Sequence, residues 1–133
     1  GTSHGAYKFK GEAKLRFDIL EKVKEKLPDT PIVLHGASSV IPRLVEMCNE
    51  NGGNIPGAKG CPNEMLKQAG ENGVSKINVD TDLRLAMTAQ VRRVFNEDPS
   101  IFDPRKYLGA ARTEIKETVS DKINNVFCSA NKA

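Results

Sequence analysis

Two short apolar segments, each ending in a polar turn and each followed by a helical stretch, constrain the fold of this chain most strongly. Residues 32–34 (IVL) form a continuous apolar run that stops at His35 and Gly36, and residues 74–80 (VSKINVD) are rich in β-branched side chains. An apolar run without alternation is typical of a parallel strand, which is buried on both faces. Repeated strand and helix units therefore predict an α/β fold in which helices cover a parallel sheet.

Helical stretches lie around and between these strands. Apolar spacing and proline or glycine boundaries predict helices over residues 14–27, 43–49, 62–70, 81–96 and 105–127, and residues 1–5 resemble the end of another strand. Five apolar residues are expected on the inner face of the helix over 81–96: Leu83, Met87, Val91, Val94 and Phe95. Thr81 suits the N-cap of this helix, and Asp82 suits the positive end of its dipole.

Composition excludes several classes of function. The chain has 20 basic and 17 acidic residues spread along its length, no tryptophan, and 5% aromatic residues, which argues against a nucleic-acid platform. No apolar run approaches the roughly 20 residues that span a bilayer, and no secretion signal is visible. Three cysteines without a CxxC spacing favour reduced thiols and a cytoplasmic location.

The unusual polar residues fall where strands are expected to end. Both histidines of the chain, His4 and His35, are followed by glycine at such a position. In a (β/α)₈ barrel the active site lies at the C-terminal ends of the strands. A metal or anion site shared by the two histidines is one interpretation, and two hydrogen-bonded core histidines are the other.

Glycines, a serine and a helix start near these histidines could bind an anion. Gly5, Gly36 and Ser38 offer backbone N–H groups and a hydroxyl, and Thr81 opens a helix. Such turns and helix N-termini bind phosphate because their N–H groups point outward without partners. The alternative is a polar loop in which Ser38 or Ser39 caps a helix.

Four motifs together carry a family resemblance. Residues 1–9 (GTSHGAYKF), 33–39 (VLHGASS), 76–82 (KINVDTD) and 102–108 (FDPRKYL) resemble successive motifs of class II, zinc-dependent fructose-bisphosphate aldolase. The resemblance extends over essentially all 133 residues. It implies that residues 1–133 are the C-terminal segment of one TIM-barrel domain, with an additional C-terminal helix. Two and a half strands cannot close such a sheet, and unpaired strand edges also indicate an incomplete barrel.

The resemblance implies a role for each site residue. His4 and His35 would be two of three zinc ligands, and a sodium or potassium ion would bind near the phosphate. The substrate phosphate would lie against Gly5, Gly36, Ser38, Asp80 and Thr81. At Asp80 the backbone N–H, rather than the carboxylate, is expected to face the phosphate. Asn78 would lie beside the enediolate, while Arg105, with Asp103 near it, would reach the far phosphate in a neighbouring subunit's site.

The implied activity is that of a glycolytic and gluconeogenic lyase. Fructose 1,6-bisphosphate would be cleaved reversibly into dihydroxyacetone phosphate and glyceraldehyde 3-phosphate by a homodimer or homotetramer. The family's third histidine, catalytic aspartate and loop glutamate have no counterpart in this chain. We therefore expect the chain to be inactive alone and to act with the N-terminal part of the same enzyme. Tagatose 1,6-bisphosphate cleavage and a non-catalytic half-barrel that binds phosphate or metal are the alternatives.

Overall fold

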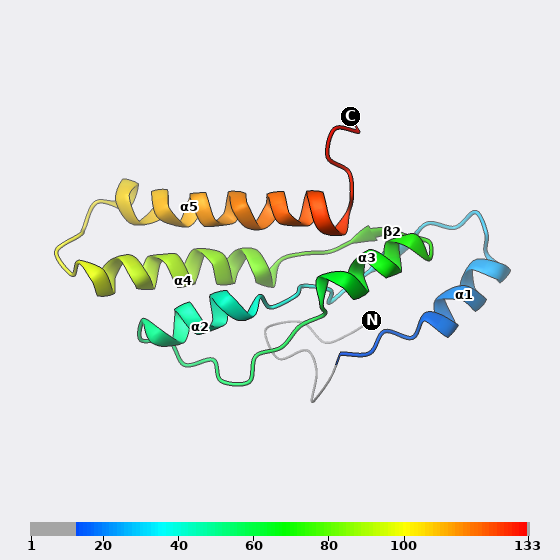
Figure 1. Ribbon diagram of the computed structural model, residues 1–133, viewed down its shortest axis with the longest axis horizontal. Helices are drawn as coiled ribbons and strands as arrows, with labels where there is room; N and C mark the ends of the chain where they lie inside the picture. Colours follow the sequence, from blue (N-terminus) through cyan, green and yellow to red (C-terminus); the bar gives the residue numbers. More distant parts are fainter. Residues whose placement is uncertain (1–12, 133) are drawn as a thin grey trace.

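The computed structural model describes residues 13–132, and the expected strand at residues 1–5 lies outside them. The described chain runs through α1 (Phe17–Lys26), β1 (Ile32–Leu34), α2 (Pro42–Glu50), α3 (Asn63–Glu71), β2 (Val74–Ile77), α4 (Thr81–Glu97), α5 (Pro104–Asp121) and the π-helix η1 (Lys122–Val126). This order confirms the predicted α/β class (Figure 1).

The two strands pair in parallel, as predicted. Ile32 lies opposite Val74 and Leu34 lies opposite Ile77. The pairing continues beyond β2, because the Asn78 backbone N–H donates to the Leu34 carbonyl over 3.0 Å. The C-terminal ends of β1 and β2 therefore lie side by side, so the turns that follow them are neighbours.

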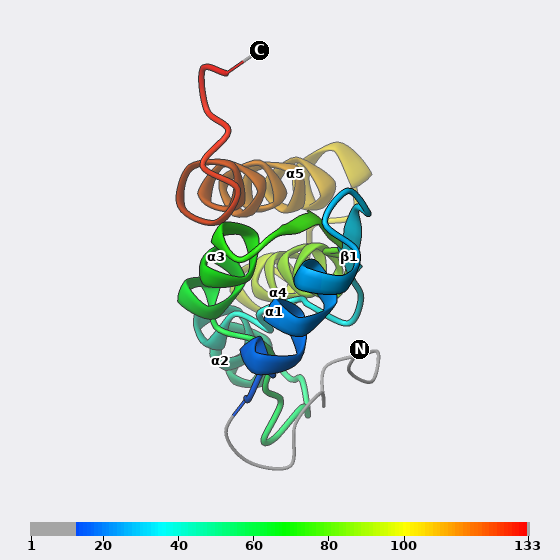
Figure 2. The same ribbon diagram turned by 90° about the vertical axis from the view of Figure 1, so that its right-hand side faces the viewer.

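Three helices form a layer beside the sheet. α4 lies between α2 and α5, and α4 and α5 form an antiparallel hairpin (Figures 1 and 2). The core of this layer contains Val40, Leu44, Cys48, Leu85, Ala86 and Ala89. A second cluster, near β2 and η1, contains Ala37, Cys61, Leu66 and Val126.

The inward face of α4 differs from the predicted one. Met87 and Phe95 were expected inside but are 43% and 39% exposed, and Leu83, Val91 and Val94 are only partly buried. The buried positions are instead Asp82, Leu85, Ala86, Ala89 and Gln90. α4 is covered on two sides, by α2 and α5, and small alanines allow both helices to approach closely.

Three predicted helix boundaries also need correction. α1 begins at Phe17 rather than residue 14, and all ten of its residues remain at least partly exposed. α4 has Asp80 at its N-cap position, and Thr81 is its first helical residue. The last predicted helix is two elements, because the α-helical pattern of α5 widens into a π-turn at Lys122.

A buried carboxylate joins the three helices of the layer. Glu114 of α5, 3% exposed, accepts from Arg43 of α2 over 2.6 and 3.2 Å and from Gln90 of α4 over 2.7 Å. The hydrogen bonds from Arg43 hold the pKa of Glu114 below its ordinary value, although burial opposes the shift. The same pair raises the pKa of Arg43.

Replacing Glu114 by glutamine is expected to lower the free energy of unfolding at pH 7 by about 1–2 kcal/mol, because a charge-assisted hydrogen bond is lost. A lowered folded-state pKa means that the stabilisation is complete above the unfolded-state pKa and disappears as the pH falls through the folded-state pKa. Urea unfolding between pH 7 and 3 should therefore show a smaller decrease in the free energy of unfolding for Glu114→Gln than for the wild type. An equal decrease in both proteins would contradict this assignment.

Candidate active site

The ends of the two strands bring a histidine and an amide together. The side-chain nitrogen of Asn78 lies 2.9 Å from His35 Nδ1. Gly36 follows with φ +65°, in the left-handed region where a side chain would be strained. The structure thus brings together three residues that the sequence selected as site candidates. The contact gives the imidazole a defined ring orientation. For His35 to bind a metal through Nε2, its Nδ1–H would have to donate, and Asn78 would have to present its amide oxygen instead of its nitrogen.

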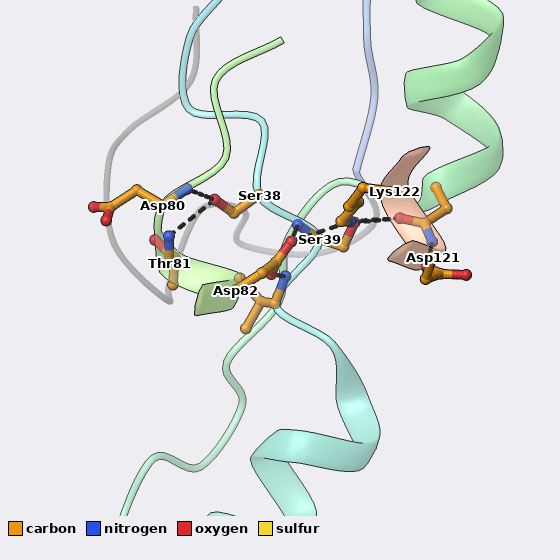
Figure 3. Close-up of polar contacts among 9 residues, drawn as sticks. Ser38, Ser39, Asp80, Thr81, Asp82, Asp121 and Lys122 are labelled. Carbon is orange, nitrogen blue, oxygen red and sulfur yellow. Dashed lines mark hydrogen bonds and ion pairs between the residues drawn. The ribbon is translucent and has the colours of Figure 1, made fainter. Parts of the chain in front are cut away.

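The hydroxyl of Ser38 lies at the start of α4. Ser38 Oγ accepts from the backbone N–H of Asp80 over 3.2 Å and from that of Thr81 over 3.1 Å (Figure 3). Ser38 is 2% exposed, so this contact fixes the loop after β1 against the helix terminus. Ser38 therefore caps a helix, but the helix is α4 and not the one that follows it in sequence.

The carboxylate of Asp80 points away from this contact (Figure 3). It pairs with Arg84 one turn later, with 2.9 Å between Oδ2 and Nη2. The backbone N–H of Asp80, in contrast, faces Ser38. The expectation that this N–H, rather than the carboxylate, faces a phosphate stays a prediction.

Two buried charges beside the turn were missed as site residues. Asp82 is fully buried and accepts from the backbone N–H groups of Ser39 over 2.9 Å and Val40 over 2.6 Å. Lys122 Nζ lies 3.1 Å from Asp82 Oδ2 and is 2% exposed (Figure 3). The sequence placed Asp82 at a helix start, but no local pattern separates Lys122 from the other lysines of the last helix.

Asp103 and Arg105 lie at the other end of the α4–α5 hairpin (Figure 1). The 17 residues of α4 separate them from Asp80, which corresponds to about 25 Å at 1.5 Å per residue. Asp103 caps α5 and accepts from the Arg105 backbone N–H over 2.9 Å. The side chain of Arg105, 91% exposed, also pairs with Asp103 over 2.6 Å. These contacts lower the pKa of Asp103 and raise the pKa of Arg105.

The described residues do not form a complete metal site. Within residues 13–132 no group of three or more histidine, cysteine, aspartate or glutamate side chains could hold a metal ion. His35 supplies one imidazole, and both His4 and Gly5 lie outside the described residues. Among the described residues, His35 can therefore supply one ligand of a zinc site. Among the helices described here, none has the length and apolar character needed to cross a membrane.

Comparison with known proteins places the whole chain in one family. The sequence profile described as "Fructose-bisphosphate aldolase class-II" matches residues 1–132. The chain belongs to the class II fructose-bisphosphate aldolase family. Membership confirms the resemblance of the four motifs, and aldolases of this family are generally zinc-dependent.

Three curated fructose-bisphosphate aldolases illustrate the relation. The Helicobacter pylori protein is 46% identical over 99% of this chain, and the Giardia intestinalis protein is 49% identical over all of it. The Thermus caldophilus protein is 47% identical over the full chain. The matched regions cover 42%, 41% and 43% of these relatives, so the chain spans about two fifths of their length.

Proposed function

We propose that this chain supplies the C-terminal strands and helices of a TIM-barrel fructose-bisphosphate aldolase. The complete enzyme, meaning this chain with the segment that supplies the remaining strands, would cleave fructose 1,6-bisphosphate into dihydroxyacetone phosphate and glyceraldehyde 3-phosphate in the cytoplasm. The observation that carries the proposal is the meeting of His35, Asn78 and the Ser38 turn at two parallel strand ends, in a chain of this family.

His35 and His4 would hold the metal of this enzyme. A bound zinc ion supplies Lewis-acid polarisation of the substrate carbonyl. The described residues offer His35 as one donor, so the remaining ligands would be His4 and a side chain from outside this chain. Asn78, which lies 2.9 Å from Nδ1, would fix the His35 ring by accepting from Nδ1–H through its amide oxygen when Nε2 binds the metal, and would lie next to the reacting carbons.

The phosphate of dihydroxyacetone phosphate would bind between the turn that follows β1 and the N-terminus of α4, together with Gly5. We call Gly36, Ser38, Asp80 and Thr81 the phosphate site. Its described donors are the Ser38 hydroxyl and the first N–H groups of α4, at the positive end of the helix dipole. A bound phosphate would replace Ser38 Oγ as the acceptor of the hydrogen bonds from these N–H groups. A sodium or potassium ion would offset part of the phosphate's negative charge.

Arg105 would act on the other phosphate of the substrate, in a different subunit. Its guanidinium is exposed, and α4 holds it about 25 Å from the phosphate site of its own chain. Asp103 orients it through paired hydrogen bonds, as expected for a group that binds phosphate in a bidentate manner. A homo-oligomer, dimeric or tetrameric, would follow from this arrangement.

The 133-residue chain alone is expected to show no aldol cleavage, because it has two of three metal-binding histidines and no catalytic carboxylate from the earlier strands. A coupled assay for triose phosphate formation, run with added zinc, tests this directly. Co-expression with the segment that supplies the remaining strands should restore turnover. Cleavage by the chain alone at the rate of the complete enzyme would overturn the proposal.

A further inference from the structure

The side chain of Asp82 uses both of its oxygens on one loop. Oδ1 accepts from the Val40 backbone N–H over 2.6 Å, and Oδ2 accepts from the Ser39 backbone N–H over 2.9 Å. The carboxylate is fully buried, so these bonds have no competition from bulk water. Asp82 therefore holds two successive peptide groups directly after Ser38.

The loop that Asp82 holds is strained. Val40 has φ +51°, a left-handed conformation that is an outlier for a β-branched residue. Val40 is also 1% exposed and belongs to the core next to α4. A strained conformation persists only when its surroundings fix it, and the carboxylate of Asp82 is the polar group that does so here.

The same contact fixes the position of Ser38 within the phosphate site. Loop and helix bind each other reciprocally: Ser38 Oγ accepts from the first N–H groups of α4, and Asp82 in the first turn of α4 accepts from the loop (Figure 3). Loss of the Asp82 contacts would free residues 39 and 40. The Ser38 hydroxyl would then lose its fixed position over the N-terminus of α4.

Lys122 balances the buried charge of Asp82. Its ammonium group lies 3.1 Å from Asp82 Oδ2 and donates to Ser39 Oγ over 2.5 Å and to Asn63 Oδ1 over 2.6 Å. Lys122 is the first residue of the π-turn η1. A π-turn inserts one residue into a helix and so changes the direction of the side chains after α5.

We propose that Asp82 is a positioning residue for the phosphate site, and that Lys122 is its buried counter-charge. Asp82 does not contact substrate itself; it shapes the loop that places Ser38. This inference rests on the proposed function, because it concerns the site where the substrate phosphate would bind.

The test compares two variants and one control variant of the complete enzyme with the wild type. In Asp82→Asn the amide has one acceptor atom for two backbone N–H groups, and Lys122 is left buried without a charged partner. We expect the KM for fructose 1,6-bisphosphate to rise at least tenfold while kcat stays within about threefold. Binding of inorganic phosphate, followed by ³¹P NMR, should weaken by a similar factor, and the thermal unfolding midpoint should fall.

The double variant Asp82→Asn/Lys122→Gln separates positioning from stability. Removing the unpaired charge should raise the unfolding midpoint back toward the wild type, while the KM and the phosphate affinity stay impaired. Asp121→Asn serves as the matched control, because Asp121 accepts from Asn63 in the same network without touching residues 38–40. Its KM should remain within twofold of the wild type.

A KM that recovers together with the unfolding midpoint in the double variant would overturn the positioning role, as would an unchanged KM in Asp82→Asn. If the wild-type complete enzyme cleaves no sugar bisphosphate, the proposed function fails, yet weaker phosphate binding by Asp82→Asn would still support the inference. If the wild-type enzyme cleaves the substrate but Asp82→Asn binds phosphate as tightly as the wild type does, the inference is rejected and the proposed function stands.

Discussion

Replacing His35 by alanine in the complete enzyme is expected to reduce kcat/KM for fructose 1,6-bisphosphate at least about 10³-fold, which corresponds to about 4 kcal/mol of transition-state stabilisation. The reason is loss of metal, because removing one imidazole from a three-ligand protein site leaves too few donors for tight binding. Zinc content, measured by atomic absorption after dialysis, should fall below one half of an equivalent per chain.

Asn78→Ala provides the matched comparison. Asn78 contacts the His35 ring through its side-chain nitrogen at 2.9 Å but is not itself proposed as a ligand. The variant should keep close to the wild-type zinc content and still lose about 10²-fold in kcat, because positioning of the imidazole and of the reacting carbons is impaired. Full zinc content in His35→Ala would remove His35 from the ligand set.

Arg105→Ala is expected to lower kcat/KM for the bisphosphate about 10²–10³-fold, because a charge-assisted contact to phosphate typically contributes several kcal/mol. Cleavage of fructose 1-phosphate, which lacks the far phosphate, should change little. Arg112→Ala is the matched control, because Arg112 is an exposed arginine two helical turns further along α5. Its kcat/KM should stay within twofold of the wild type.

A mixture of two inactive variants can show whether Arg105 acts between subunits. A site shared by two chains takes His35 from one chain and Arg105 from the other. Co-expressed in equal amounts, His35→Ala and Arg105→Ala chains form mixed dimers in half of all cases, and one of the two sites in each mixed dimer is intact. Recovered activity should then approach one quarter of the wild type. If Arg105 served its own chain, no mixed dimer would contain an intact site, and activity would stay at the level of the single variants.

The strands and their order could be predicted because their signals are local. An uninterrupted apolar run at 32–34 and a β-branched run before Asn78 each indicate a parallel strand, and the structure confirms both strands and their pairing. The expected burial on both faces is not seen in the described residues, because Val74 is the one buried residue of the two strands and Val33 is 42% exposed. Parallel pairing then places His35 beside Asn78 without further information. The Ser38 turn was predicted beside them because glycine- and serine-containing turns after strands expose groups that bind phosphate.

The inner face of α4 could not be predicted in this way. A search for large apolar residues selects Met87 and Phe95, but a helix between two other helices is buried through small residues such as Ala86 and Ala89. Which side of such a helix is covered depends on partners distant in sequence. For the same reason the pairing of Asp82 with Lys122 could not be predicted. The two residues are 40 positions apart in the sequence, and their side chains meet only because α5 folds back along α4.

The α4–α5 hairpin limits which insertions this chain can accommodate. α4 places Arg105 about 25 Å from the strand ends, and α5 returns over the same distance to place Lys122 beside Asp82. An insertion in α4 alone would shift Arg105 outward and also move Lys122 out of register with its partner. A length change that keeps both contacts of this chain must therefore occur in both helices together, in whole turns.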